Sequence, residues 1–557
     1  MKAKKQNDKS SQFIVRTGLI KIGLPLLLTI VWGIMASKTF NEKPDLNGDN
    51  FCYYIFSTSL ATGHGYADLS KPDAPPTATF PPGYPILMTP LRMMTDSIVA
   101  QKWLNEIFVL AGVLLLFFIL LRLDMRWDIS LAAAIAGLFC PRLWHFSTMM
   151  MSEASFFFTS ILVFYALIRL YPANEKTTDK KWYDDLKNPW LWVMIIVLVF
   201  NYHIRTQGLA LLAAIILCLL IGKHWTATAT TIIKRKAVVC IVGSVATIIG
   251  FIVGCLPYML RNRLLGLNGN RYMDTIMLSN PFQPEAGTLT LGEVVVRFFQ
   301  TLKMLIFNAI PNTIFPYLNV NCDAGEYSAG IYIIGALVFI VILIGCWSMG
   351  KLRWAALGYL AATLGLISIF STPSGNRYIT SILPLLAAGL FCGIWQIVKW
   401  CFYKRREWLV QGTALILCLM LIASKNGINQ EIEQSKQKYP INYVQFFNLG
   451  KQLKKTAPAG TIVCSRKPQM FWLKSQMPGV SYLFTSDRHA LIADLIDKKV
   501  DYVVLDALGY GSTPMYLFPA VQEYGRYFQI VTQYDNTHTY LLKFNRERAA
   551  TDFENEN

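Results

Sequence analysis

Residues 45–90 combine acidic, aromatic and turn-forming side chains in a pattern that can support chemistry. Asp49 stands directly before a helix-like run, Asn50–Ala61, which is followed by Gly-His-Gly-Tyr and Pro-Pro-Gly-Tyr-Pro turns. A carboxylate at this position can activate a hydroxyl or amine as a general base. It can equally cap the helix that follows, a common role for Asp. The residues alone leave both roles open. The other aspartates of the stretch are Asp45, Asp68 and Asp73.

Three arginines and one glutamate lie in short polar breaks between apolar segments. Arg205 occurs in Tyr-His-Ile-Arg-Thr-Gln-Gly, Arg261 in Pro-Tyr-Met-Leu-Arg-Asn-Arg and Arg377 in Ser-Gly-Asn-Arg-Tyr. The planar guanidinium of Arg binds two phosphate oxygens at once, although an Arg at such a place can also extend to lipid headgroups. Glu153, in Met-Ser-Glu-Ala, is a second candidate carboxylate, or a charge favoured at a helix start by the dipole.

Metal and nucleotide sites have no clear signature in this sequence. His64, His145 and His203 have no zinc-ligand spacing, so polar packing is the expected role. Gly509-Tyr510-Gly511 is too short for a nucleotide-binding fingerprint. We therefore expect no cofactor, with a divalent metal left open. A Cys52–Cys322 disulfide is also left open, because sequence cannot establish pairing.

The composition indicates that membrane-spanning helices position these residues. The chain has 557 residues, of which 54% are hydrophobic and 15% are charged, as in polytopic membrane proteins. The net charge of +18 could indicate nucleic acid, but the Lys and Arg residues concentrate in short loops between apolar segments. This distribution is typical of positive-inside topology and argues against a nucleic-acid partner.

Eleven apolar segments are predicted to span the membrane, which keeps every basic loop and the N-terminus on the cytoplasmic side. The segments near 190–202 and 208–221 are interpreted as two spans, because one long helix would place Lys234–Lys236 outside. A helix with one apolar face over 295–309 is expected to lie at the interface. The predicted spans are Leu19–Ser37, Ile107–Leu121, Ile129–Cys140, Ala154–Leu170, Trp190–Tyr202, Gly208–Ile221, Ala237–Tyr258, Gly330–Met349, Trp354–Phe370, Ile379–Trp400 and Trp408–Ala423.

Two domains are expected. Residues 1–423 form a membrane domain with outer loops at 38–98 and 261–329, and residues 424–557 form a small domain. In the second domain short strands alternate with helices, which indicates an α/β fold, and span parity places it outside the cytoplasm.

The order of features around Asp49 resembles the first outer loop of polyprenyl-phosphate-dependent glycosyltransferases of the GT-C fold. The sequence is most similar to bacterial protein mannosyltransferase-like and aminoarabinose transferase-like enzymes, with Pro-x-x-x-Arg-Asn at Arg261 and Arg-Tyr-x-x-x-x-x-Pro at Arg377. The resemblance covers Leu19–Leu390. It implies a GT-C membrane protein of the bacterial inner membrane with its site facing the periplasm, and span parity then places the C-terminal domain in the periplasm too.

The same resemblance implies an inverting transferase that moves a sugar from polyprenyl (undecaprenyl) phosphate to an acceptor. Phosphate leaves as a stabilised anion, so no general acid is needed, in contrast to glycosidases. A base and phosphate-binding cations suffice. The implied site has catalytic Asp49 and Glu153, donor-phosphate-binding Arg205, Arg261 and Arg377, and substrate-binding Tyr53, Tyr54, His64, Tyr84 and Tyr378, without a metal ligand.

Departures from the family limit the substrate. The Glu-Lys-Pro lysine of aminoarabinose transferases is absent, since the corresponding stretch is Thr79-Phe80-Pro81-Pro82. The Trp-Trp-Asp signature of oligosaccharyltransferases is absent too. These differences argue against aminoarabinose as the donor sugar and against transfer of a whole glycan to Asn. The acceptor stays open between lipid A, another lipid-linked glycan and protein.

Two alternatives come from other functional classes. A transporter or lipid-linked sugar flippase usually has paired halves and charges near mid-membrane, whereas these charges lie at span ends. A receptor anchored by its spans, with a ligand-binding C-terminal domain, would not need eleven of them.

Overall fold

A computed structural model shows a chain that divides into two compact units. The helical unit comprises Met1–Glu42, Ala78–Tyr84 and Lys102–Ser435. The mixed unit comprises Lys43–Thr77, Pro85–Gln101 and Lys436–Asn557. The structure describes residues 19–46, 48–170, 183–221, 230–267, 276–279, 287–315, 326–370, 375–402 and 406–556.

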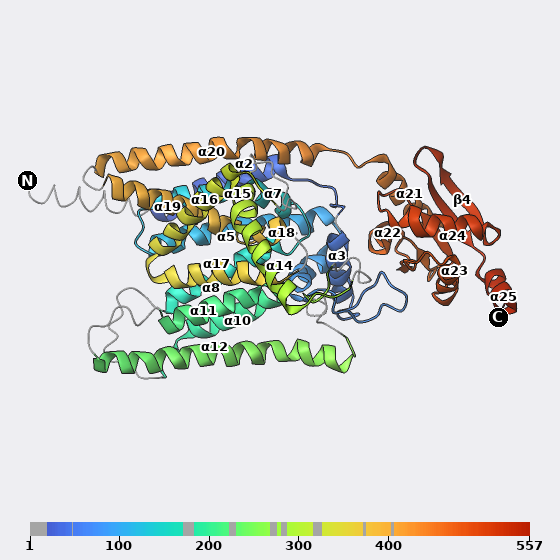
Figure 1. The fold of residues 1–557 in the computed structure, drawn as a ribbon, viewed down its shortest axis with the longest axis horizontal. Coiled ribbons are helices and arrows are strands. Elements are labelled where there is room, and N and C mark those ends of the chain that lie inside the picture. The colour runs from blue at the N-terminus through green and yellow to red at the C-terminus, as the bar shows by residue number, and fades with distance from the viewer. Residues whose placement is uncertain are drawn as a thin grey trace, which may run out of the picture. The chain divides into compact units, whose positions relative to one another are not determined.

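The helical unit is a bundle of apolar helices, several of which run side by side (Figure 1). Within the described residues, nine helices are long and apolar enough to cross a membrane, or ten if one bent pair counts as a span. Each of the eleven predicted spans overlaps a helix, although α6, α10 and α11 are by themselves too short to be among these nine. The corresponding helices are α2 (Leu24–Thr39), α5 (Ile98–Arg122), α6 (Trp127–Leu138), α8 (Glu153–Leu170), α10 (Pro189–Ile204), α11 (Gly208–Ile221), α12 (Thr230–Leu264), α16 (Ala329–Ser348), α17 (Arg353–Ile369), α19 (Leu383–Cys401) and α20 (Arg406–Lys436).

The segment 291–314 is a further apolar helical stretch. It consists of α14 (Leu291–Met304), a π-helical turn (Leu305–Ala309) and α15 (Ile310–Ile314). It starts sharply because Thr290 and Glu293 form a capping box. By length and composition it could cross a membrane, so the interfacial position expected from its one-sided apolar face stays a prediction.

Glycines allow α16 and α19 to approach closely. A Cβ on Gly345 would lie 1.8 Å from the carbonyl oxygen of Gly389, and a Cβ on Gly393 would lie 1.9 Å from that of Val341. Gly389 and Gly393 form a Gly-x-x-x-Gly pair of the kind that brings helix backbones together in membranes. The two backbones are therefore in direct contact.

A bent pair of helices, α6 and α7 (Pro141–Ser147), precedes α8 in the chain. Helix α6 is followed by α7 at an angle of 59°. Pro141 is suited to a first helical turn and cannot continue α6, because it lacks the N–H that an interior position must donate. This agrees with the predicted end of the third span at Cys140, directly before Pro141. The residues 148–152 then connect α7 to α8, which begins at Glu153.

The mixed unit contains the predicted C-terminal α/β domain. Its five-stranded sheet has the order β2-β1-β3-β5-β4, in which β1 pairs in parallel with β2 and β3 while β5 is antiparallel to β3 and β4. The strands are β1 (Val463–Cys464), β2 (Gly479–Val480), β3 (Tyr502–Leu505), β4 (Phe528–Tyr534) and β5 (Thr539–Phe544). The principal helices are α21 (Ile441–Thr456), α22 (Pro468–Ser475), α23 (Arg488–Asp497), α24 (Phe518–Glu523) and α25 (Arg546–Glu556).

The first outer loop is also part of the mixed unit. Its helix α3 (Gly48–Ala61) packs against α22 of the C-terminal domain. The carbonyl of Ser70 accepts a 2.6 Å hydrogen bond from the amide of Gly479 at the start of β2. Residues separated by about four hundred positions therefore form one compact body. Three shorter helices complete the elements used below: α4 (Gly83–Met94), α9 (Asp184–Lys187) and α18 (Gly375–Thr380).

Candidate functional site

A buried carboxylate lies between two arginines in the helical unit. Glu153 Oε1 accepts hydrogen bonds from Arg205 Nη1 at 2.8 Å and from Arg377 Nε at 3.1 Å. The Glu153 side chain is 2% exposed, whereas that of Arg377 is 25% exposed. Glu153 starts α8, Arg205 follows α10 and Arg377 lies in α18. Three residues predicted from separate parts of the sequence are thus brought together.

The cluster joins two cations to one carboxylate oxygen. Both guanidinium groups contact Glu153 Oε1. Glu153 Oε2 is buried and has no hydrogen-bond partner among the described residues. Two guanidinium groups side by side can bind a phosphate or another oxyanion, because each guanidinium can donate two parallel hydrogen bonds to its oxygens.

Tyr378 and Gln207 connect the ends of α10 and α18. The Arg205 guanidinium lies 5.7 Å from the ring centre of Tyr378, and Arg205 Nη1 donates to Ser152 Oγ at 3.1 Å. Gln207 Nε2 donates to the carbonyl of Tyr378 at 3.3 Å. The half-buried ring of Tyr378, predicted to bind substrate, therefore lies beside one of the two cations.

Tyr84 is completely buried and supports the turn before α8. Its hydroxyl donates to Asn105 Oδ1 at 3.1 Å. Asn105 Nδ2 in turn donates to the carbonyls of Met149 and, at 3.0 Å, Met151. These hydrogen bonds fix the backbone that leads into Glu153. In this structure Tyr84 acts on the site through Asn105.

Sequence reasoning missed two buried charges on α5. Lys102 and Glu106 are one helical turn apart and are 1% and 0% exposed. Glu106 Oε1 accepts from Ser147 Oγ at 2.8 Å, and Lys102 Nζ donates to the carbonyl of Asn41. The signal was available, because Lys102, Asn105 and Glu106 interrupt the apolar pattern of a span. The predicted span has its apolar core at Ile107–Leu121 and starts near Val99, so both residues fell inside the predicted span but were not recognised as candidate functional residues.

Arg261 lies near the end of α12, beside Tyr258. Its guanidinium is 6.0 Å from the Tyr258 ring centre, and its Nη1 donates to Asn262 Oδ1 at 2.8 Å. The Tyr258 ring is 5.6 Å from that of His203, two residues before Arg205. The Tyr258 hydroxyl donates to the carbonyl of Phe80 at 3.3 Å. Through Tyr258 and His203, Arg261 is therefore linked to the chain segment that carries Arg205.

The Pro-Pro-Gly-Tyr turn is packed against the end of α10. A Cβ on Gly83 would lie 2.6 Å from the backbone of His203 and Ile204. Only glycine fits there without a shift of one backbone.

Asp49 belongs to the mixed unit, whereas Glu153 and the three arginines belong to the helical unit. It lies half-buried in the first turn of α3, which begins one residue earlier at Gly48. Negative charge is favoured there by the helix dipole. Asp49 and Asp68 both raise the pKa of the Cys52 thiol, after the larger effect of its burial. The expectation that Asp49 shares a cavity with the arginines stays a prediction.

The other predicted substrate residues of this loop have structural contacts. Tyr54 donates from its hydroxyl to the carbonyl of Asp96 at 3.0 Å, and the Arg92 guanidinium lies 4.2 Å from its ring centre. Tyr53 is 3% exposed. His64 is exposed, with Nδ1 2.9 Å from Thr62 Oγ1. Of these three, only His64 presents its side chain to solvent.

The histidines for which polar packing was expected have separate polar partners. His145 Nδ1 lies 3.1 Å from Glu431 Oε2, and His203 Nδ1 lies 3.1 Å from the carbonyl of Val199. The described part of the chain holds no group of three His, Cys, Asp or Glu side chains arranged to bind a metal ion. Cys322, considered as a disulfide partner of Cys52, lies outside the described residues.

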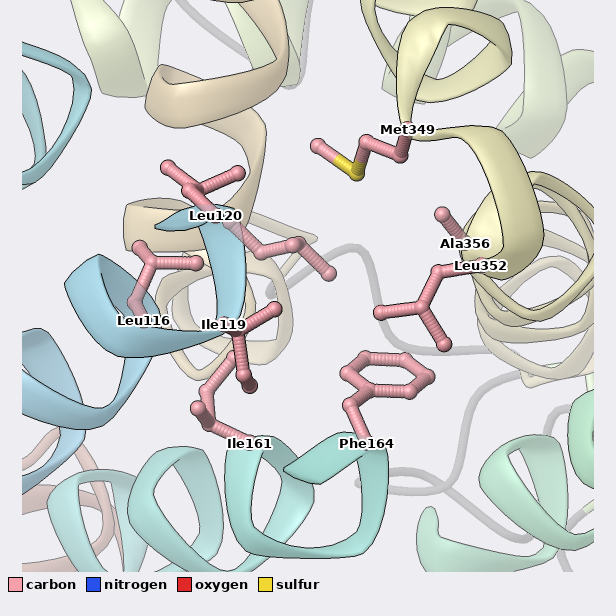
Figure 2. Close-up of a pocket in the computed structure, with 9 residues that line it drawn as sticks. Leu116, Ile119, Leu120, Ile161, Phe164, Met349, Leu352 and Ala356 are labelled. Carbon is pink, nitrogen blue, oxygen red and sulfur yellow. The ribbon is translucent and has the colours of Figure 1, made fainter. Parts of the chain in front are cut away.

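A small cavity inside the helical unit is lined only by apolar side chains (Figure 2). Its volume is about 10 Å³, room for one water molecule at most. Without polar groups it offers no chemistry. It is lined by Leu116, Ile119, Leu120, Ile161, Phe164, Met349, Leu352, Ala356 and Leu385.

Comparisons with known proteins give similarity in structure but not in sequence. No protein-family model matches the chain. No curated protein matches it either.

Among solved structures, the archaeal oligosaccharyltransferase AglB from Archaeoglobus fulgidus, in complex with an inhibitory peptide and a dolichol-phosphate, superimposes with a TM-score of 0.56 at 10% identity. That match covers 92% of this chain and 73% of that chain. ArnT from Cupriavidus metallidurans bound to undecaprenyl phosphate superimposes with a TM-score of 0.56 at 11% identity, and the match covers 94% of this chain and 97% of that chain. The apo state of the same ArnT superimposes with a TM-score of 0.54 at 11% identity, and the match covers 95% of this chain and 98% of that chain. Such similarity concerns the fold: this protein is a polytopic helical membrane protein of the GT-C fold with a small C-terminal α/β domain.

Proposed function

We propose that this protein is a membrane glycosyltransferase that moves a sugar from a polyprenyl phosphate to a periplasmic acceptor, with inversion. The observation that carries the proposal is the Glu153–Arg205–Arg377 cluster, in which two arginines from separate parts of the chain contact one carboxylate oxygen. The fold supports it, since two similar structures contain dolichol-phosphate and undecaprenyl phosphate.

The donor phosphate binds to Arg205 and Arg377, with Arg261 as a third cation. When the bond between the anomeric carbon and the phosphate oxygen breaks, its electron pair stays on the phosphate. Guanidinium groups that are already oriented stabilise this charge without reorganisation. Glu153 acts as a positioning residue, because it holds both guanidinium groups through one carboxylate oxygen.

Asp49 acts as the general base. It accepts the proton of the acceptor hydroxyl or amine as that atom bonds to the anomeric carbon. The attack comes from the face opposite the leaving phosphate, which inverts the configuration. Half-buried at the start of α3, the carboxylate is accessible enough to meet an acceptor.

A second candidate function is transport of a lipid-linked sugar across the membrane. The observation that favours it is the buried Lys102 and Glu106 on α5, since ionisable groups inside spans often mark a pathway.

One experiment separates the two functions. Purified protein in nanodiscs receives undecaprenyl phosphate carrying a radiolabelled sugar, together with fractions of envelope lipids and glycans. A transferase releases undecaprenyl phosphate and labels one acceptor fraction, and Arg377→Ala abolishes both effects. Movement of labelled lipid between the leaflets of liposomes, without any release, would establish the flippase instead.

The orientation is tested separately. We propose that the N-terminus is cytoplasmic and the mixed unit is periplasmic in a bacterial inner membrane, since this topology keeps the basic loops inside. Ser486→Cys, at an exposed position after β2, should react with a membrane-impermeant thiol reagent in intact spheroplasts. Reaction only after lysis would reverse the topology.

A further inference from the structure

The parallel part of the sheet in the mixed unit ends in a cluster of polar residues. Strands β1 and β3 are adjacent and parallel, so their carboxyl ends lie at the same edge. Ser465, Arg466 and Lys467 follow β1, while Asp506 and Tyr510 lie in the segment that follows β3. In open α/β sheets, ligands bind outside the carboxyl ends of such strands. We call these five residues the β-edge cluster.

Three polar atoms of the β-edge cluster are buried without a partner. They are Ser465 Oγ, Arg466 Nε and Asp506 Oδ2, none of which has a hydrogen bond among the described residues. Ser465 is 0% exposed and Asp506 is 6% exposed. A buried polar group left unpaired destabilises the folded protein. Three such groups at one edge indicate a place where a ligand supplies the missing partners.

Aromatic rings hold the cations of the cluster. The Arg466 guanidinium lies 4.9 Å from the ring centres of both Phe484 and Tyr510. Lys467 Nζ lies 4.5 Å from the ring centre of Tyr510. Contact with two rings restricts the guanidinium, so less side-chain entropy is lost when an anion binds.

The loop after β3 is fixed by hydrogen bonds from outside it. Asn442 Nδ2 donates to the carbonyl of Ala507 at 2.6 Å, and the Tyr443 hydroxyl donates to that of Leu508 at 3.2 Å. Asp506 Oδ1 accepts from the amide of Leu508 at 3.3 Å. The carboxylate that remains half-satisfied is therefore held in place before any ligand arrives.

We propose that the β-edge cluster binds a phosphorylated sugar. Arg466, Lys467 and Ser465 supply cations and a hydroxyl for the phosphate oxygens. Asp506 accepts hydrogen bonds from sugar hydroxyls. The chemistry thus needs both an anionic and a hydroxylated part in one ligand.

The cluster lies close to the proposed base, within the mixed unit. Lys467 Nζ is 3.8 Å from the position that a Cβ on Gly48 would take, and Gly48 directly precedes Asp49. A sugar phosphate held there brings its hydroxyls toward α3. On the proposed function, from which this step follows, the ligand is the acceptor of the transferred sugar.

Calorimetric titration of the full-length protein in zwitterionic nanodiscs tests the site. The probe is glucose 1-phosphate, compared with glucose and with inorganic phosphate. We expect glucose 1-phosphate to bind more tightly than either part, and Arg466→Gln to weaken it at least tenfold. Arg526→Gln is the matched control, because Arg526 also lies 4.9 Å from a tyrosine ring, that of Tyr527.

A second comparison locates the probe. Arg377→Gln should weaken binding of undecaprenyl phosphate and leave glucose 1-phosphate unaffected. Loss of glucose 1-phosphate binding in Arg377→Gln with retention in Arg466→Gln would overturn the proposal, as would no binding to the wild type. If Arg466→Gln does not fold by scanning calorimetry, Lys467→Gln decides between the same outcomes.

The phosphorylated sugar can be soluble or part of a glycolipid headgroup. Nanodiscs containing a phosphorylated glucosamine lipid distinguish these sources. Competition with glucose 1-phosphate supports a lipid-borne ligand, and its absence supports a soluble one. Because binding is measured without turnover, a protein that binds the probe but transfers no sugar refutes the proposed function and leaves the site standing.

Discussion

Glu153 Oε1 and Arg377 Nε lie 3.1 Å apart although 224 residues separate them in the sequence. Burying such a pair is costly unless both charges are well satisfied, and replacing it by apolar side chains is often neutral or stabilising. Its presence at the ends of apolar helices is therefore better explained by function than by stability. Together with Arg205, this pair forms the cluster to which we assign binding of the donor phosphate.

Glu153→Gln should change both donor binding and stability. The amide keeps the shape but removes the negative charge that both guanidinium groups contact, so undecaprenyl phosphate should bind more tightly. Stability should fall by about 1.5–3 kcal/mol, the usual worth of hydrogen bonds to charged groups. Thermal unfolding and lipid titration in nanodiscs measure the two effects, with Glu433→Gln on the exposed side of α20 as control. Unchanged lipid affinity would remove Glu153 from the site.

Asp49→Asn should separate a catalytic from a structural role. Asn keeps the shape and loses only the interaction of the charge with the helix dipole, about 0.3–1 kcal/mol, so folding and donor binding should be retained. Turnover should fall roughly 10²–10⁴-fold, because the side chain can no longer accept a proton. The release of undecaprenyl phosphate per enzyme gives this rate. A fully active Asp49→Asn protein would assign the base to another carboxylate, first of all Glu153.

Arg377→Lys should preserve charge and lose affinity. The ammonium cannot bind two phosphate oxygens in a planar fork and cannot reproduce the Nε contact to Glu153. Undecaprenyl phosphate should bind roughly 10–100-fold more weakly, with a slower transfer rate as well. Arg126→Lys is a suitable control, since Arg126 pairs with Asp128 and its side chain is 43% exposed. Equal affinity in both variants would show that Arg377 does not contact phosphate.

Gly345→Ala should disrupt the contact between α16 and α19. The new methyl group would lie 1.8 Å from the carbonyl of Gly389, so the helices must separate. We expect a loss of about 1–3 kcal/mol or more from overpacking. Gly365→Ala on α17 is the control, because nothing lies within 4 Å of its Cβ position. A thermal unfolding scan in detergent compares them, and equal midpoints would contradict the close packing.

Asp506 should make the mixed unit less stable as pH rises. Burial raises the pKa of Asp506 to about 6, against hydrogen bonds from the backbone of Leu508 and Arg466. A carboxyl with a raised folded pKa contributes stability that is present below about pH 4 and is lost as pH rises through 6. Arg466 also acts on Asp506, and the Asp506 charge acts on Cys464, Tyr443 and Tyr482. Burial raises the pKa values of the Cys464 thiol and the two tyrosine hydroxyls, so these three groups do not titrate in this window.

Asp506→Asn tests that dependence. The variant should be more stable than the wild type at pH 7.5, by at most about 3 kcal/mol, and equal to it near pH 4. Scanning calorimetry of the full-length protein across this range gives the difference. A difference that does not vary with pH would show that Asp506 does not titrate in the window.

The sequence predicted the fold well because membrane helices follow a local rule. Long apolar runs had to be helices, and each predicted span overlaps one. It also singled out Glu153, Arg205 and Arg377, which the structure brings into contact, while their roles in a site stay predictions. It could not predict that one carboxylate holds both arginines, because that contact depends on how distant helices pack.

Other parts were missed for identifiable reasons. Lys102 and Glu106 were not singled out, because they lie before the apolar core that defined the span, in the first turns of α5. Ser465 and Asp506 were not recognised, since only the pairing of β1 with β3 brings them together.

The packing of α3 against α22 has a consequence for biosynthesis. Residues 43–77 leave the ribosome long before residues 468–475. The first loop therefore cannot pack against α22 until most of the chain has been synthesised. During this time Phe51 and Phe56, both 0% exposed in the finished protein, have no assembled C-terminal domain beside them. A chain shortened before β1 would carry this loop permanently incomplete and would be recognised by quality-control proteases as unfolded.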